Sequence, residues 1–301
     1  MITIETSRLL LRNYRVTDFE DIIKYFSDEE ISKFLQIVAD NGYNEHFHWG
    51  RLDWSMAHSY LDVEMLSRNV LFRKENGELV GAVVYDTDYN DRWYIIHSIS
   101  DENLLGQMIE YVTEADINTA IIKANLNDTM LCRLLVNAGF ENQHLQSVLE
   151  INLSRNLSFQ LPQGYYLNAP DSKIDTWQWR LVIYRGFNHE GILQEPGEEV
   201  AKAGKHLEIP EYIKVFAIKD GEYAAHCGVW YNGGNTAYIE PVATVTEHRG
   251  KGLGRAVVYE AVNRAKERGA KRAIVLSDRD FYKRLGMIKS SEVGTWVRNS
   301  K

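Results

Sequence analysis

The sequence predicts an α+β fold of two tandem domains, each with a mixed, mostly antiparallel sheet and flanking helices. Three observations predict it. The chain has 301 residues, whereas an ordinary domain has roughly 150. Each half contains two apolar runs joined by a short turn, which is typical of an antiparallel hairpin. The elements also follow in the same order in both halves, which indicates an internal duplication. We therefore expect domains at residues 1–155 and 156–301.

In the first half, Asn76-Gly77 lies between the apolar runs 69–73 and 79–85 and predicts a tight hairpin. Thr17, with Glu20 three residues later, is a capping box that predicts a helix start. Apolar patterns predict four further elements: a strand at 9–12, a helix at 103–115, a strand at 119–124 and a short helix near 128–137 that ends at Gly139.

The second half repeats this series. Its predicted elements are strands at 213–218, 223–231, 236–245 and 273–276, a helix from about 253 to 268, and a short helix at 279–285. One face of the long helix carries Leu253, Val257, Ala261 and Ala265, so this face should be buried. The short helices of the two halves end at similar pairs, Gly139-Phe140 and Gly286-Met287, each followed by a last strand.

The composition is that of a globular protein, with 45% hydrophobic and 25% charged residues, which excludes wholesale disorder. No apolar run approaches the roughly 18 residues of a membrane span, and the N-terminus lacks a signal-peptide core. We therefore expect a cytoplasmic protein without a membrane partner. Cys132 and Cys227 form no CxxC pair, and the histidines between 46 and 58 follow no ligand spacing, so we expect no metal.

The net charge of −8 is distributed unevenly. Residues 1–155 hold 13 Lys and Arg against 25 Asp and Glu, a net charge of −12. Residues 156–301 hold 21 against 17, a net charge of +4. The acidic half argues against nucleic acid or an anionic cofactor binding there. The basic half is compatible with a phosphate-bearing ligand, although ordinary surface variation gives the same pattern.

The most informative segment is a glycine-rich turn between a strand and the long helix of the second half. Gly250, Gly252 and Gly254 let successive backbone N–H groups converge without obstruction by Cβ atoms. The helix start adds the positive end of its dipole.

Three basic residues, Arg249, Lys251 and Arg255, are interspersed with these glycines and add positive charge to the turn. We interpret the turn as a pyrophosphate cradle rather than as a turn with solvated basic residues. Its G-x-G-x-G spacing fits neither the nucleoside-triphosphate loop nor the dinucleotide fingerprint.

The pattern Arg249-x-x-Gly252-x-Gly254 resembles the coenzyme A pyrophosphate motif of the GNAT superfamily of N-acetyltransferases. The segment 238–244 resembles the central strand of that family, and 280–287 resembles its later motif, in which a Tyr precedes a Gly-Phe pair. Met287 in place of Phe and Thr246 in place of Pro are small departures. The resemblance covers about residues 160–301 and extends more faintly to the first half, as in a tandem GNAT protein.

The resemblance implies an N-acetyltransferase that transfers the acetyl group of acetyl-CoA directly to a primary amine. The backbone of the central strand would pair with the pantetheine arm, and one of its N–H groups would polarise the acetyl carbonyl. The residues implied to bind coenzyme A are Val242, Ala243, Thr244, Arg249, Gly250, Lys251, Gly252, Leu253, Gly254 and Arg255.

Tyr282 is implied to be the general acid that protonates the leaving thiolate, since a phenol with a pKa of about 10 holds its proton at neutral pH. Glu240 is a candidate general base, because on an extended strand it would share a face with Val242. Binding of a cationic substrate and a structural salt bridge are alternative roles for Glu240. His226, on the neighbouring strand, is a competing base, and residues 187–190 form a candidate cleft loop.

The two halves differ at the residues that carry the resemblance. In place of the glycine turn, the first half has a segment from His97 to Gly106 with one glycine, no basic residue and two acids. Leu135 stands where the second half has Tyr282. We hypothesise that the first half is a degenerate copy that braces or shapes the substrate cleft.

Two other functions stay open. A non-catalytic acyl-CoA sensor would need the cradle but not the phenol of Tyr282. An acyltransferase with another acyl donor, or with a thiol or hydroxyl acceptor, would use the same residues. For the leading hypothesis we expect a small-molecule or protein amine as the acceptor, no nucleic-acid partner, and a monomer or homodimer.

Overall fold

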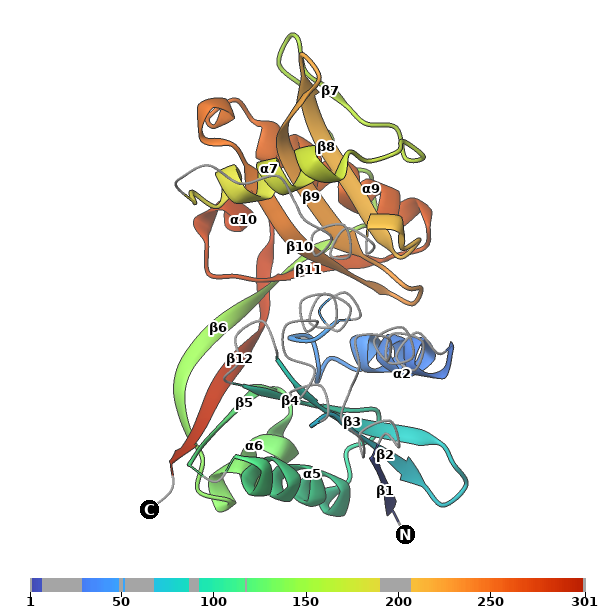
Figure 1. The fold of residues 1–301 in the computed structure, drawn as a ribbon, viewed down its shortest axis with the longest axis vertical. Coiled ribbons are helices and arrows are strands. Elements are labelled where there is room, and N and C mark those ends of the chain that lie inside the picture. The colour runs from blue at the N-terminus through green and yellow to red at the C-terminus, as the bar shows by residue number, and fades with distance from the viewer. Residues whose placement is uncertain are drawn as a thin grey trace. The chain divides into compact units, whose positions relative to one another are not determined.

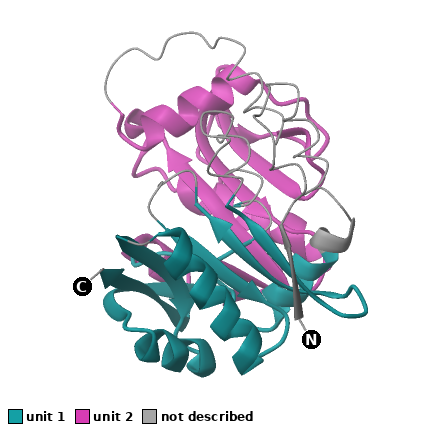
Figure 2. Cartoon of the chain, turned by 60° about the horizontal axis from the view of Figure 1, so that its bottom comes forward, with its two compact units in different colours: residues 1–149, 276–278, 289–301 teal, residues 150–275, 279–288 magenta. Residues whose placement is uncertain are grey.

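The computed structural model describes residues 2–6, 29–48, 51, 68–86, 92–116, 118–189 and 207–299. The strand expected at 9–12 and the helix start expected at Thr17 lie outside these residues. Contacts divide the chain into two compact units (Figure 2). Unit 1 comprises residues 1–149, 276–278 and 289–301, and unit 2 comprises residues 150–275 and 279–288. These units are made of non-contiguous segments, so they do not test the boundary expected between two copies of the fold after residue 155. That boundary stays a prediction.

Unit 1 contains a mixed sheet in which most neighbours are antiparallel (Figure 1). Across the sheet its strands are β1 (Ile2–Thr6), β2 (Val70–Lys74), β3 (Leu79–Tyr85), β4 (Trp93–His97), β5 (Thr119–Asn125), β12 (Ile288–Asn299) and β6 (Glu141–Asn152). Of the described pairs, β4 and β5 are parallel. The hairpin β2–β3 is confirmed, and Gly77 at its turn has the left-handed φ of 87° that favours glycine.

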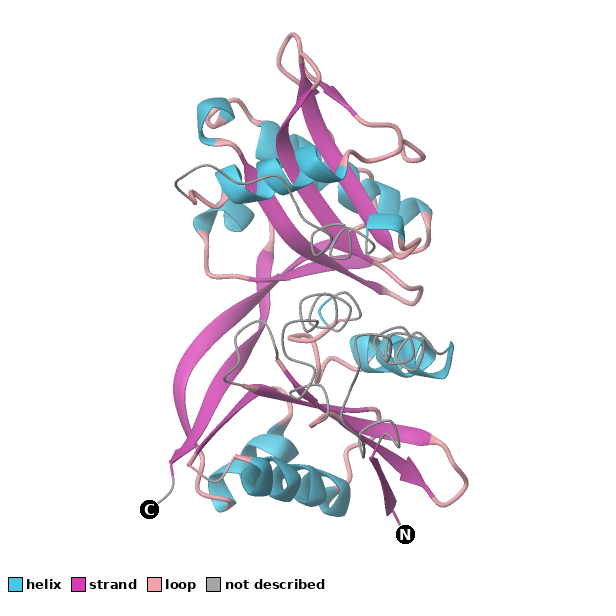
Figure 3. Cartoon of the chain, in the orientation of Figure 1, coloured by secondary structure: helices cyan, strands magenta, loops and turns pink. Residues whose placement is uncertain are grey.

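Helices cover both faces of this sheet (Figure 3). Trp93 and Ile95 of β4 face the core under α5 (Glu102–Ala115) and α6 (Thr129–Asn137). The alternate residues Tyr94 and Ile96 face the core under α2 (Glu29–Asp40). Burial of their apolar stripes stabilises α5 and α6, which confirms the helices expected at 103–115 and near 128–137.

Unit 2 has a similar arrangement. Across its sheet the strands are β11 (Arg272–Leu276), β10 (Thr236–Thr244), β9 (Glu222–Trp230), β8 (Tyr212–Lys219) and β7 (Tyr166–Leu167). Neighbours are antiparallel except β10 and β11, which are parallel. The expected strands are thus confirmed to within a few residues, and so is the mixed, mostly antiparallel fold class.

Two long helices lie on opposite faces of the unit 2 sheet, α7 (Thr176–Gly186) and α9 (Leu253–Glu267) (Figure 1). The apolar face expected on α9 is buried, because Leu253, Val257, Ala261 and Ala265 are each at most 1% exposed. The short helix α10 (Asp280–Arg284) follows β11, as expected. Among the described residues, no helix is both long enough and apolar enough to cross a membrane.

The short helices α6 and α10 end in the same way. The N–H of Phe140 donates to the carbonyl of Leu135 at 2.9 Å, and the N–H of Met287 donates to the carbonyl of Tyr282 at 3.2 Å. The glycine before each apolar residue has a positive φ, 86° in α6 and 83° in α10. Both ends are Schellman motifs. Leu135 and Tyr282 therefore occupy equivalent positions in the two units.

The last strand of the chain completes the sheet of unit 1. β12 pairs antiparallel with β5 from Val293, opposite Asn125, to Asn299, opposite Thr119. Lys123 Nζ also donates to Thr295 Oγ1 at 2.6 Å, across a separation of 172 residues. The Trp296 side chain is 6% exposed and belongs to the core under α5 and α6. Unit 1 therefore depends on a segment from the end of the chain.

Replacing Trp296 by alanine should destabilise unit 1, because emptying a buried Trp site costs about 3–5 kcal/mol. Amide exchange under increasing urea should show lost protection in α5 and β5. Val297→Ala, at a half-buried position on the same strand, is the matched control and should change little. Loss of protection confined to unit 2 would contradict the assignment of β12.

Candidate functional site

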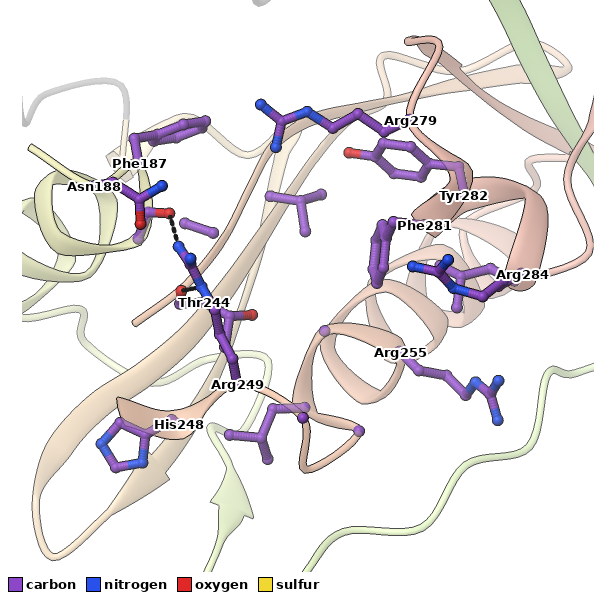
Figure 4. A pocket seen from close by; sticks show the side chains of 18 residues that line it. Phe187, Asn188, Thr244, His248, Arg249, Arg255, Arg279, Phe281, Tyr282 and Arg284 are labelled. Atoms are coloured by element: carbon purple, nitrogen blue, oxygen red, sulfur yellow. Dashed lines mark hydrogen bonds between the residues drawn. The ribbon is translucent and has the colours of Figure 1, made fainter. Parts of the chain in front are cut away.

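A cavity of about 680 Å³ opens in unit 2 where the turn after β10 meets α9, α10 and the end of α7 (Figure 4). The residues that line it are 186–188, 242–244, 248–250, 252–255, 279, 281, 282, 284 and 285. Phe187 and Asn188 of the expected cleft loop are among them, whereas Glu190 lies outside the described residues. All of the described lining residues belong to unit 2.

The glycines of the turn meet two different requirements. Gly250 and Gly252 have φ of 74° and 82°, a conformation that other residues rarely adopt. At Gly254 the constraint is packing, because a Cβ atom there would lie 3.1 Å from the Phe281 ring. Gly252 is the N-cap of α9, and no side chain caps this helix. The first N–H groups of α9 therefore border the pocket uncapped, which suits an anion.

Positive charge dominates the lining of the pocket. Its four arginines are Arg249, Arg255, Arg279 and Arg284, and no lining residue is Asp or Glu. The sequence pattern did not single out Arg279 and Arg284, although both lie within three residues of Tyr282. His248 also borders the pocket, where burial lowers the pKa of its ring and Lys251 adds to the effect. The combined field favours a ligand that carries phosphate.

Two basic residues expected in the cradle have partners within the protein. Arg249 lines the pocket, but its Nε donates to the carbonyl of Thr244 at 3.0 Å and its Nη2 to that of Gly186 at 2.7 Å (Figure 4). Lys251 is not a lining residue, and its Nζ donates to the carbonyl of Glu247 at 3.0 Å. The cations of the pocket without a partner among the described residues are Arg255 and Arg284.

The strand β10 parts from its parallel neighbour where the pocket begins. The two strands pair from Thr236, opposite Arg272, to Tyr238, opposite Ile274. Beyond this point Val242, Ala243 and Thr244 line the pocket while still pairing with β9 on the other side. Backbone groups on the open side of β10 are therefore available to an extended ligand.

The Tyr282 ring is 8% exposed and lines the pocket from α10, with its hydroxyl directed into the cavity (Figure 4). Burial raises the pKa of this phenol, and the nearby Cys227 and Glu240 raise it further, whereas Arg279 opposes them. Because the neutral form is favoured, the group can hold a proton in the pocket over the physiological range.

Glu240 lies close enough to Tyr282 to raise its pKa, but it does not line the pocket. Its side chain is exposed. The pairing with β9 shifts register between Ile239, opposite Val229, and Val242, opposite Cys227, so β10 carries one extra residue there. This bulge interrupts the alternation of faces, so Glu240 and Val242 do not share a face as the sequence predicted.

Two histidines noted in the sequence are core residues. His226 is fully buried, its Nδ1 faces the carbonyl of Val215 at 3.1 Å, and its Nε2 faces the Tyr212 hydroxyl at 3.0 Å. It therefore does not compete as a base. His46 is 3% exposed, and burial is the main cause that lowers its pKa to about 3. Within the described ranges, no group of three or more His, Cys, Asp or Glu could hold a metal ion.

The equivalent region of unit 1 is closed by its own side chains. The Asp101 carboxylate caps α5 by accepting the N–H of Leu104 at 2.8 Å, where α9 has only Gly252. The buried His97 at the end of β4 hydrogen-bonds through Nε2 to Asp128 at 2.5 Å. A carboxylate already occupies the N-terminus of α5, so this helix does not offer the anion site that α9 offers.

Some lining residues had no sequence signal. Gly186 ends α7 so close to β10 that a Cβ atom would lie 2.7 Å from Ala243 Cβ. Phe281 gave no signal on its own, although its neighbour Tyr282 belongs to a recognised motif. Only the contact between α10 and the start of α9 shows that this ring packs on Gly254.

A family match and similar solved structures identify the fold. Residues 176–287 match the model of the Acetyltransferase (GNAT) family. The structure is similar to a tandem GNAT protein from the clavulanic acid biosynthesis pathway, with a TM-score of 0.61, 13% identity, and coverage of 100% of this chain and 99% of that chain. At this identity the likeness shows the fold.

Two further similar structures are GCN5-related N-acetyltransferases. The one from Sphaerobacter thermophilus has a TM-score of 0.55 and 14% identity, covering 100% of this chain and 96% of that chain. The one from Kribbella flavida has a TM-score of 0.52 and 16% identity, covering 81% and 94%. No curated protein sequence matches the chain significantly.

The raised pKa of Tyr282 predicts that its phenol stays neutral where an ordinary tyrosine titrates. Its contribution to stability is therefore present below the unfolded pKa of about 10 and is lost as pH rises through the folded-state value. The tyrosinate absorbance of the folded wild type should equal that of Tyr282→Phe at about pH 10. An excess of half a tyrosinate in the wild type would contradict the raised pKa.

Proposed function

Since residues 176–287 match the model of the Acetyltransferase (GNAT) family, we propose that the protein is an N-acetyltransferase that moves the acetyl group of acetyl-CoA to a primary amine. The observation that carries the proposal is a single pocket with an uncapped helix N-terminus at one side and a buried, neutral phenol at the other. The first feature suits the diphosphate of coenzyme A. The second suits a leaving group that must gain a proton.

The residues of the pocket divide the binding of the donor between them. The N–H groups of Gly250, Gly252 and the first turn of α9 bind the diphosphate, with Arg255 and Arg284 adding charge. The backbone of residues 242–244 aligns the pantetheine arm along the open side of β10, and one of its N–H groups polarises the thioester carbonyl. Arg249 and Lys251 have a smaller part in this binding than the sequence indicated, because their donors contact backbone carbonyls.

Tyr282 acts as the general acid. Its hydroxyl faces the cavity and keeps its proton until a thiolate develops nearby. The thiolate forms in the same water-poor pocket, where burial raises the pKa of a thiol as well as that of a phenol, so the proton can pass between them. A pocket that only sensed acyl-CoA would not need this phenol.

Glu240 accepts the proton of the amine, directly or through a water molecule. This role is supported by the effect of Glu240 on Tyr282. Its charge raises the pKa of the Tyr282 phenol, which indicates that the carboxylate lies near the reacting end of the pocket. Its exposure to solvent lets it pass the proton to water.

The first half, in this proposal, is the degenerate copy and binds no coenzyme A. Its support is the Asp101 cap on α5, the apolar Leu135 in place of Tyr282, and the net charge of −12 over residues 1–155. Each of these disfavours an anionic donor.

Tyr282→Phe should lower turnover by about 10²–10⁴-fold, because a positioned acid is worth that much, while the Kd for acetyl-CoA stays unchanged. Glu240→Gln should lower it by roughly 10²-fold. The measurement is thiol release from acetyl-CoA with a panel of primary amines, alongside Kd by calorimetry. Tyr166→Phe, at a 53% exposed tyrosine of β7, is the matched control.

The same assay separates the other functions. Acetyl-CoA binding without thiol release for any amine would favour a sensor, and release only with longer donors, thiols or alcohols would favour another acyltransferase. Normal turnover of Glu240→Gln across the pH range would remove Glu240 as the base.

Calorimetry should give one acetyl-CoA per chain, and Gly252→Ala should weaken binding by about tenfold or more, because a side chain strains the left-handed conformation that aims the N–H groups. Gly221→Ala, at φ of 86° and with nothing within 4 Å of the added Cβ, has the same strain outside the pocket and should bind normally. Two molecules per chain, or full binding by Gly252→Ala, would refute a single site in the second half.

A further inference from the structure

The end of α7 lies directly on the end of β10. A Cβ atom added at Gly186 would lie 2.7 Å from Ala243 Cβ and 3.0 Å from the N atom of Thr244. Gly186, Phe187 and Asn188 line the pocket, and Figure 4 shows Phe187 and Asn188 across the cavity from Tyr282. We name this segment, 186–188, the α7 wall. Its position decides how wide the pocket is opposite the general acid.

Arg249 joins the α7 wall to the turn that carries the glycines. Its guanidinium holds the Gly186 carbonyl at 2.7 Å through Nη2 and the Thr244 carbonyl at 3.0 Å through Nε. Charged hydrogen bonds of this length are about twice as strong as neutral ones, and solvent screens part of this strength because Arg249 is exposed. Because the two acceptors are backbone carbonyls at the last residues of α7 and β10, the bridge holds the ends of these two elements together.

Two weaker contacts accompany this bridge. Arg185 pairs with Glu247 at 3.1 Å, but both side chains are exposed, 45% and 64% respectively. Exposed pairs of this kind contribute little. Thr246 Oγ1 donates to Asn188 Oδ1 at 3.4 Å, which is long for a hydrogen bond between side chains. Among these contacts with the α7 wall, the 2.7 Å bond from Arg249 is the shortest, and Arg249 alone also bonds the end of β10.

We propose that Arg249 is a positioning residue that couples occupation of the glycine turn by a diphosphate to the order of the α7 wall. The residue immediately follows Thr246–His248 and precedes Gly250, whose φ of 74° is readily adopted only by glycine. An anion on the N–H groups of Gly250 and Gly252 holds the turn still, and this holds the guanidinium on Gly186. The binding of a diphosphate at this turn rests on the proposed function, whereas the Arg249 bridge does not.

The coupling is reciprocal. If a bound diphosphate orders the α7 wall, an ordered wall must raise the affinity for the diphosphate by the same factor. The enzyme would then shape the wall opposite Tyr282 once the donor is in place. The sequence pattern assigned Arg249 to the phosphate directly, and the bridge gives it a different role.

Amide exchange of residues 187–189 reports on the α7 wall. Their N–H groups donate to the carbonyls of Ile183, Arg185 and Tyr184 at 2.9, 3.2 and 3.2 Å and close the end of α7. In ligand-free protein, Arg249→Gln should speed their exchange by about tenfold, the loss expected for a charged hydrogen bond. Arg249→Lys keeps the charge but cannot bond the Thr244 and Gly186 carbonyls at the same time in the way the guanidinium does. In this variant the amides of residues 187–189 should also exchange faster.

Arg255→Gln is the matched comparison, because Arg255 borders the same pocket and has no partner among the described residues. It should weaken acetyl-CoA binding and leave the exchange of 187–189 unchanged. At saturating acetyl-CoA, these amides should be further protected in the wild type and in Arg255→Gln but not in Arg249→Gln. Thermal unfolding of each variant confirms that it is folded.

Unchanged exchange in ligand-free Arg249→Gln and Arg249→Lys would overturn the proposal. So would faster exchange of 187–189 when acetyl-CoA binds to the wild type, because Arg249 would then have left Gly186 for the phosphate. If acetyl-CoA does not bind at all, the proposed function fails, yet the exchange of the ligand-free variants still tests the bridge.

Discussion

Strand β10 keeps its pairing with β11 only over Thr236–Tyr238, and the rest of the strand has a β-neighbour on the β9 side alone. Backbone groups that leave a sheet need other partners. In unit 2 the opening leads to the pocket, which is bordered by residues 242–244, the uncapped start of α9 and Tyr282. The positions of the glycine turn, the start of α9 and Tyr282 around one pocket depend on this separation of β10 from β11, because β10 leads through the turn directly into α9.

In both units two parallel strands pair over only a few residues and then separate. In unit 2 a pocket lies beyond this point, whereas in unit 1 side chains of the protein bond to one another there. In unit 1, β4 and β5 pair at Trp93 and Tyr94, and His97 beyond them is bonded to Asp128. Asp101 supplies its helix with the negative charge that a ligand would otherwise supply. The Schellman ends of α6 and α10 match, so the units differ elsewhere: the turn before α9 has left-handed residues at Gly250 and Gly252, whereas the shorter turn before α5 supplies the Asp101 cap.

Local signals predicted the elements well, because a hairpin at Asn76-Gly77 or an apolar face on α9 depends on residues within one or two turns. The glycine turn was recognised from its local pattern of glycines and basic residues, and Tyr282 from the resemblance of 280–287 to a GNAT motif; both border the pocket. Three features were beyond the sequence: the Arg249 contact with Gly186, 63 residues away, the bulge before Val242, and the pairing of β12 with β5. Each depends on contacts between distant segments or on a register shift, and no periodic pattern records these.

The place of β12 has a consequence for how the chain is made. A ribosome releases the strands β1 to β5 long before residues 289–299 exist, so the β5 edge stays without its neighbour throughout synthesis of the second half. Unpaired edges of this kind are prone to association with other chains. Unit 1 therefore starts to form first but is completed last. Until β12 has been synthesised, the β5 edge of the nascent chain is open to pairing with other chains.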